Sequence, residues 1–188
     1  AGQARSDSWR RALLVEAAEI FLTQCAQPDQ AVPLLEQAST LAPEDRALKL
    51  RLGEALQDAG RADDARALLR DMIDAFAGRR PKERATVHFH LARLNLRLGD
   101  RAQALAELEA ATRIDPANPE ILRMVAELAR DDGQLDKAER SYRALLAVVR
   151  RAEDDAPVLR SEVLVELSAL AERQGEPERA AEILESAF

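Results

Sequence analysis

The sequence lacks the materials from which several protein classes are built. Cysteine occurs once, at Cys25, which excludes an internal disulfide and a structural zinc site made of thiolates. Only 3% of the residues are aromatic, and the apolar runs are short, whereas a membrane span needs about 20 consecutive apolar residues. The two histidines, His88 and His90, are two residues apart and do not share a helix face as metal ligands would. We therefore expect no disulfide, direct membrane insertion, metal or cofactor.

The charge balance also narrows the class of partner. The chain has 27 basic and 34 acidic residues and a net charge of -7, so it is not a free-standing basic binder of nucleic acid. The charge is uneven, because residues 46–160 contain 22 basic and 20 acidic residues, whereas residues 1–45 and 161–188 are acidic. Arginine outnumbers lysine 24 to 3, which with 37 alanines predicts a bacterial source with a GC-rich genome.

Small residues recur along the chain with a spacing of about 34. The spacing resolves residues 12–188 into five units after a lead-in or cap at residues 1–11, with 5 extra residues before the third unit and 8 before the fifth. The units begin at Ala12, Arg46, Ala85, Pro119 and Ser161. Their fifteenth positions are Ala26, Gly60, Gly99, Gly133 and Gly175. Their twentieth positions are Ala31, Ala65, Ala104, Ala138 and Ala180.

Each unit is predicted to be a pair of amphipathic helices. Apolar residues recur at steps of three and four, as in Leu48, Leu52 and Leu56. A glycine at position fifteen can adopt the left-handed conformation that ends a first helix. A small residue at position twenty lets the second helix approach the first. We predict an all-α fold, a right-handed α-α superhelix of about five helix hairpins.

These residues resemble the tetratricopeptide repeat family over about residues 12 to 188. The fourth unit carries the pattern of large, small and turn residues best, with Leu122, Val125, Ala126, Gly133, Ala138 and Tyr142. Two residues depart from the pattern. Glu19 occupies a position that is usually small, which we interpret as an end unit facing water, and Lys49 replaces a large apolar residue.

No residues suggest catalysis. The sequence has no acid–base pair, nucleophile elbow or phosphate-binding glycine loop. His88 is expected to pack in the core, and Cys25 is expected to be a small buried hydrophobe. We predict that the protein is not an enzyme.

The family resemblance implies a concave groove lined by the first helix of each unit, which holds a partner peptide or helix. The groove positions of the three central units give the predicted peptide-binding residues, which are Leu50, Glu54, Phe89, Arg93, Leu96, Arg97, Arg123, Glu127 and Arg130. An exposed Phe89 beside four arginines suits an acidic peptide with one apolar anchor. A second interpretation is that Glu54, Arg93 and Glu127, all at the ninth position, pair with one another as a charge ladder. The lysine and asparagine clamp by which some members hold chaperone tails is not present, since those positions are Glu16 and Ile20.

The predicted function is a scaffold for protein–protein interaction that binds a peptide or helix in the groove. The alternative is an architectural spacer, or a self-associating segment of a larger multi-domain protein, with no groove ligand. We expect Trp9 to cover the first unit, and Ile183, Leu184 and Phe188 to leave an open patch through which a homodimer forms. We also expect the sequence to be a piece of a longer protein, and its localisation stays open.

Overall fold

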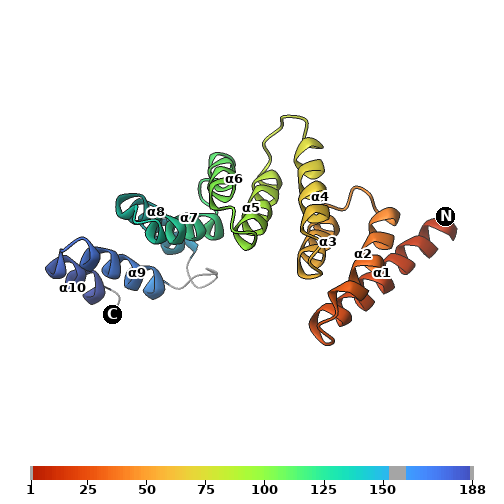
Figure 1. Cartoon of the computed structure of the whole chain (residues 1–188), viewed down its shortest axis with the longest axis horizontal. Helices are drawn as coiled ribbons and strands as arrows, with labels where there is room; N and C mark the ends of the chain where they lie inside the picture. Colours follow the sequence, from red (N-terminus) through yellow and green to blue (C-terminus); the bar gives the residue numbers. More distant parts are fainter. Residues whose placement is uncertain (1, 153–159, 187–188) are drawn as a thin grey trace. The chain divides into compact units, whose positions relative to one another are not determined.

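The computed structural model describes residues 2–152 and 160–186, and every regular element in these residues is an α-helix (Figure 1). The helices are α1 (Gly2–Thr23), α2 (Pro28–Leu41), α3 (Arg46–Asp58), α4 (Ala62–Asp74), α5 (Lys82–Arg97), α6 (Arg101–Ile114), α7 (Pro119–Asp131), α8 (Leu135–Ala152), α9 (Arg160–Arg173) and α10 (Pro177–Glu185). The predicted all-α fold is confirmed.

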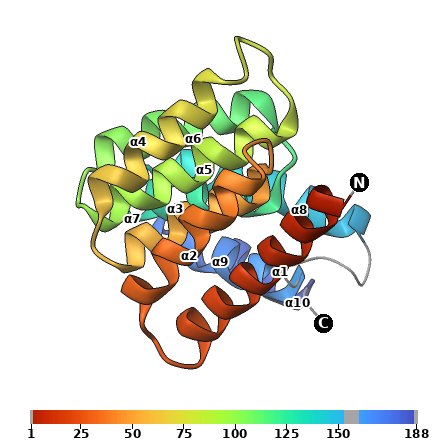
Figure 2. The same cartoon turned by 90° about the vertical axis from the view of Figure 1, so that its right-hand side faces the viewer.

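The first of two compact units covers residues 1–100 and contains α1 to α5. Each helix packs against the next one along the chain, and α3 also contacts α5. Figure 2 shows α3 and α4 side by side. The core is mostly aliphatic, and its members include Val32, Leu35, Leu52, Leu56, Leu69, Phe76, Leu91 and Leu94.

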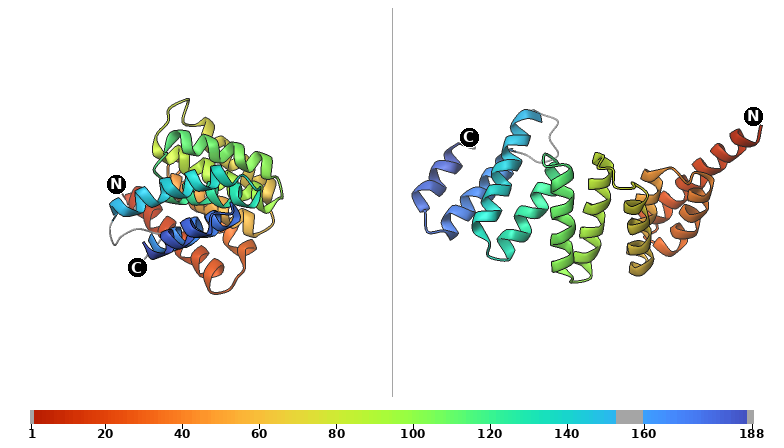
Figure 3. Two further views of the ribbon diagram at one scale, coloured as in Figure 1. Left: turned by 90° about the vertical axis from the view of Figure 1, so that its left-hand side faces the viewer. Right: turned by 90° about the horizontal axis from the view of Figure 1, so that it is seen from above.

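The second unit covers residues 101–188 and contains α6 to α10. Its helices also pack in chain order, and the pairs α7–α8 and α9–α10 can be followed in Figure 3. Its core is built on Leu122, Tyr142, Leu145, Val163, Leu167 and Leu170.

The predicted turn residues have the conformation that their spacing required. Gly60, Gly99, Gly133 and Gly175 have φ between 73° and 81°, in the left-handed region that glycine enters at little cost. At each of these turns the next residue donates its backbone N–H to the carbonyl five residues earlier, as Arg61 does to Leu56 at 2.8 Å. This bond satisfies a carbonyl that the end of the helix would otherwise leave free.

The predicted close contact at position twenty is also present. Ala31, Ala65, Ala104 and Ala138 are completely buried, and Ala180 is 2% exposed. A larger side chain at these sites would push its helix away from its neighbours, since protein interiors leave little empty space. The five alanines therefore mark places where the distance between helices is fixed.

The structure corrects three expectations about exposure at the ends. Trp9 is 69% exposed on α1 and does not cover the first unit. Cys25 is exposed because it follows the end of α1, in the turn before α2. Ile183 is partly buried against the second core, so only Leu184 of the expected patch is open, at 37% exposure. The third patch residue, Phe188, lies outside the described residues.

Candidate functional site

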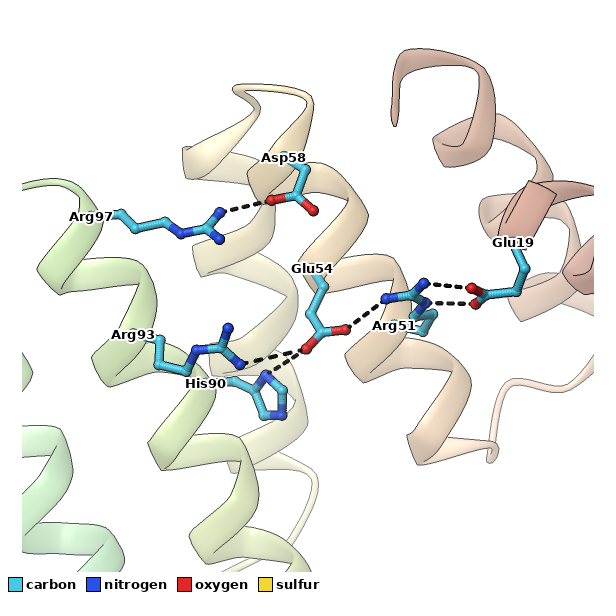
Figure 4. A network of polar contacts seen from close by, with 7 residues as sticks. All are labelled: Glu19, Arg51, Glu54, Asp58, His90, Arg93 and Arg97. Carbon is cyan, nitrogen blue, oxygen red and sulfur yellow. Dashed lines mark hydrogen bonds and ion pairs between the residues drawn. The ribbon is translucent and has the colours of Figure 1, made fainter. Parts of the chain in front are cut away.

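Charged residues of α1, α3 and α5 gather on one side of the first unit, which we call the first-helix face (Figure 4). Its residues are Glu19, Arg51, Glu54, Asp58, His90, Arg93 and Arg97. The three helices that carry them are each separated from the next by one helix in the chain. This arrangement follows from a chain of helix pairs, in which the first helices of neighbouring pairs lie next to each other.

Arg51 of α3 connects two carboxylates on this face. Its Nε lies 2.6 Å from Oε1 of Glu19 and its Nη2 lies 2.5 Å from Oε2, a two-point contact between α3 and α1. Its Nη1 also donates to Oε2 of Glu54 at 3.1 Å. The hydrogen bonds from Arg51 hold the pKa of Glu19 below its usual value of 4.5. Glu19 is therefore a charged contact between repeats rather than an acid that only faces water.

Glu54 is shared by three basic side chains. Its Oε2 accepts from Arg51, while its Oε1 lies 3.6 Å from Nδ1 of His90 and 3.7 Å from Nη1 of Arg93. The pairing of Glu54 with Arg93 is the first step of the predicted charge ladder. Farther along the same helices, Arg97 donates to Asp58 at 2.7 Å.

Phe89 is not the exposed anchor that the sequence suggested. It is only 9% exposed, and its ring meets the ring of His90 edge to face at 6.1 Å between centroids. The physical reason is that α5 packs against both α3 and α4, which buries more of its circumference than one stripe. Leu50 and Leu96, the other apolar residues predicted for this surface, are half-buried.

The three predicted residues of the second unit lie on α7. Arg123 and Glu127 are one helical turn apart, with Nε and Oε1 separated by 3.9 Å. Arg130 donates from Nη1 to Oε2 of Glu166 on α9 at 2.5 Å, and the Tyr142 hydroxyl of α8 donates to the same oxygen at 3.4 Å. Burial raises the pKa of Glu127 above its usual value although the charge of Arg123 opposes the shift.

A cleft lies between α7 and α9 in this unit, with α8 beneath it. Its volume is about 400 Å³. We call it the α7–α9 cleft, and it is lined by Arg123, Glu127, Tyr142, Leu145, Ser161, Glu162, Val163, Val165 and Glu166. Burial, followed by the charge of Glu166, raises the pKa of Tyr142 above its usual value of 10.

The described residues were also compared with the requirements of metal binding and of membrane crossing. In the described part of the chain, no three His, Cys, Asp or Glu residues are placed to hold a metal ion. His88 is 8% exposed and lies in the packed part of α5, as expected. Across residues 2–152 and 160–186, no helix combines the length and the apolar character that crossing a membrane requires.

Sequence comparison identifies the family. Models described as tetratricopeptide repeat match residues 26–83 and residues 85–128, which together exceed half of the chain. The chain is a tetratricopeptide-repeat protein. Proteins of this family bind protein partners and are generally non-catalytic scaffolds, so this tetratricopeptide-repeat protein is a scaffold for protein interaction. No curated protein has a matching sequence.

Solved structures agree with an all-α solenoid of tetratricopeptide repeats. BtubC (BKLC) from P. vanneervenii has a TM-score of 0.76 at 18% identity, over 99% of this chain and 84% of that one. PilW, a type IV pilus biogenesis factor, has a TM-score of 0.70 at 18% identity, over 95% and 77% of the two chains. The repeats of a putative kinesin light chain from Podosopora anserina reach 0.68 at 23% identity, over 95% and 93%. At these identities the similarity concerns the fold.

Three charged residues of the tetratricopeptide-repeat protein were missed as members of the site. Arg51 and Glu166 occupy the sixth position of their units, outside the groove positions of the family, yet each forms an ion pair between first helices. Glu19 was noticed only as a departure from the pattern. The available signal was the charge of Glu19 at a position that the family fills with a small residue. A charged side chain there is expected to pair with a residue of the next repeat.

Proposed function

We propose that this chain is a non-enzymatic scaffold whose first-helix face binds an acidic segment of a partner protein. The observation that carries the proposal is that, among the described residues, Arg93 has as its ion-pair partner only Glu54, a carboxylate that Arg51 and His90 also approach. The family's general role in protein interaction supports the scaffold, and the geometry of Arg93 supports the acidic partner.

Arg93 has the longest ion pair among the residues of the first-helix face. Its contact with Glu54 is 3.7 Å, against 3.1 Å for the contact of Arg51 with the same carboxylate, and 40% of its side chain is exposed. A carboxylate from a partner can bind Arg93 while the contact between Arg51 and Glu19 stays intact. Arginine suits this role because its planar guanidinium binds a carboxylate at two points.

Arg97 gives the face a second exchangeable cation. It is 52% exposed, and its counterion Asp58 is 47% exposed. Ion pairs at this exposure contribute about 0–1 kcal/mol, so replacing Asp58 by a partner carboxylate costs little. Leu50 and Leu96, both half-buried, supply the apolar contact that was first assigned to Phe89. The charge ladder and partner binding are therefore two states of the same side chains.

A peptide selection on the full chain tests this proposal. Random peptides displayed on phage are selected against the protein, and enriched sequences are synthesised with a fluorophore for anisotropy measurements. We expect enrichment of Asp and Glu, and dissociation constants about 100-fold higher for the Arg93→Gln, Arg97→Gln variant, since each of the two lost charged hydrogen bonds accounts for about tenfold.

The matched control is Arg70→Gln, which removes an exposed arginine from α4, a second helix of its pair. Its affinity for the same peptides should equal that of the original chain. Absence of enriched peptides, or equal loss of binding in the control, would favour the spacer function without a groove ligand. Self-association stays a separate prediction, which light scattering at several concentrations tests.

A further inference from the structure

We propose that the α7–α9 cleft of the second unit receives an arginine side chain of the partner. The inference rests on the proposed function for the source of the arginine, and it adds the chemistry that the second unit recognises. Three features of the cleft support it, namely its apolar base, its exposed valine and the acidic character of its rim.

The base of the cleft is apolar and firmly packed. Tyr142, Leu145 and Val163 are at most 2% exposed, so they belong to the core and hold the base in position. Above them Val165 is 53% exposed on α9, an apolar side chain left in contact with water. The volume of about 400 Å³ falls within the range of about 300–1,000 Å³ typical of binding pockets.

The rim carries more negative charge than its own cations neutralise. Glu166 is engaged by Arg130 at 2.5 Å, and Arg123 is the one cation among the residues that line the cleft, beside Glu127, Glu162 and Glu166. Arg123 is 3.9 Å from Glu127, too far for a hydrogen bond. Glu162 has no ion-pair partner among the described residues, although its place in the first turn of α9 is favourable for an acid.

The protonation behaviour of Glu127 agrees with this charge balance. Burial, the largest influence, raises its pKa, as do the charges of Glu166 and Asp131, although Arg123 and Arg130 act in the opposite direction. A carboxylate in this condition gains from an added cation at close range. The bound arginine should therefore lower the pKa of Glu127.

An arginine side chain satisfies both parts of the cleft at once. Its three-carbon stem lies on apolar surface while its guanidinium stays at the wet, charged rim. The planar guanidinium can bridge two carboxylates and is less strongly hydrated than the lysine ammonium. An acidic side chain would be repelled by Glu127 and Glu162. A purely apolar side chain would leave their charges without compensation.

The test uses small probes on the full chain labelled with carbon-13 at valine and leucine methyl groups. N-acetyl-arginine methylamide is compared with N-acetyl-citrulline methylamide, which has nearly the same shape and no charge. We expect saturable shifts of the Val163 and Val165 methyl signals, with the citrulline probe bound about tenfold more weakly because it lacks a charged hydrogen bond.

A Glu127→Gln, Glu162→Gln variant should bind the two probes equally. The matched control, Glu172→Gln, Glu178→Gln, removes two exposed acids of the same unit outside the cleft and should keep the preference for arginine. Circular dichroism and melting curves establish that both variants fold.

Equal binding of the two probes to the original chain, shifts confined to methyl groups away from the cleft, or an unchanged preference in the cleft variant would each overturn the inference. The proposed function fails by a different result, which is peptide binding insensitive to Arg93 and Arg97. The two failures are distinguishable because the probes report on the second unit and the peptide variants on the first.

Discussion

The ion pair between Glu19 and Arg51 should stabilise the docking of α1 on the rest of the first unit. We predict that Glu19→Gln and Arg51→Met each lower the free energy of unfolding. The double variant should lose less free energy of unfolding than the sum of the two single losses. The reason is that the pair joins residues 32 positions apart across two helices. A double-mutant cycle measures their coupling free energy directly.

The expected coupling is about 1 kcal/mol, the upper end for exposed pairs. The side chains of Arg51 and Glu19 are 34% and 39% exposed, which keeps the energy far below that of a buried pair. The two-point contact and the additional bond to Glu54 place it at the top of the exposed range. In a chain of this length, about 1 kcal/mol corresponds to about 2–4 °C in melting temperature.

The coupling should depend on pH in one direction. Because the pKa of Glu19 is lower in the folded chain than in the unfolded one, the stabilisation is fully present above the unfolded pKa. It is lost as the pH falls through the folded pKa, below the usual value of 4.5. Urea denaturation at neutral and at acid pH measures the coupling free energy under both conditions.

Hydrogen exchange tests which helices lose stability when the ion pair between Glu19 and Arg51 is removed. Stability in repeat arrays is a sum of neighbouring contacts, so the variants should raise exchange in α1 and α2 and leave α9 and α10 unchanged. The pair of Arg66 with the almost fully exposed Asp63, at 3.5 Å, is the control and should couple less. A coupling of zero, or one that persists unchanged in acid, would refute the reasoning.

Three further predictions follow from local geometry. Ala26 has a φ of 51°, so Ala26→Gly should stabilise the chain in thermal melts by about 0.5–1 kcal/mol, while Gly133→Ala should destabilise it by about 1 kcal/mol. Ser168 is 3% exposed and donates to the Ala180 carbonyl at 3.0 Å, so Ser168→Ala should cost about 1–2 kcal/mol in urea denaturation. Tyr142 is the only tyrosine, and an ultraviolet titration should show no ionisation at pH 10 until the chain unfolds, because burial raises its pKa.

The helix pairs were predictable because two small-residue positions record backbone geometry directly. Glycine is required where the chain takes a left-handed turn, and alanine where two helices meet closely. Gly99 and Ala104 each fulfil one of these roles, with a φ of 78° and complete burial. Such constraints depend on residues near in sequence, so a single sequence reveals them. The turn at Ala26 shows that the geometry persists even where the glycine is replaced.

The exposure of large side chains was harder to predict, because it depends on how many neighbours a helix acquires. Phe89 lies at a position that faces the groove in the family, but α5 has two helix neighbours and buries it. Trp9 fails in the opposite direction, since it extends from α1 into water. Periodicity predicts which stripe is apolar and does not predict how wide the buried stripe is.

Ion pairs between repeats were missed for a related reason. A repeat pattern aligns equivalent positions, and it suggested that the ninth residues of neighbouring units pair with one another. Glu54 and Arg93 do lie 3.7 Å apart, and Arg97 and Asp58, both at the thirteenth position, lie 2.7 Å apart, but the contact of Glu19 with Arg51 joins unlike positions. Long arginine side chains reach carboxylates at other positions of the neighbouring first helix, as Arg51 does to Glu19 and Arg130 to Glu166.

The unequal strength of these contacts explains how one surface can be both a stabilising network and the proposed binding face. Arg51 holds Glu19 at two points and Glu54 at one, so the network is anchored near α1. On α5, Arg93 receives only a share of a carboxylate that His90 also approaches. We therefore expect an acidic group of a partner to bind best at Arg93 of α5, whose ion pair with Glu54 is long and shared. Because Arg51 holds Glu54, we predict that Arg51→Met frees Glu54 to pair with Arg93 more closely, and so weakens the proposed binding without touching a residue proposed to contact the partner.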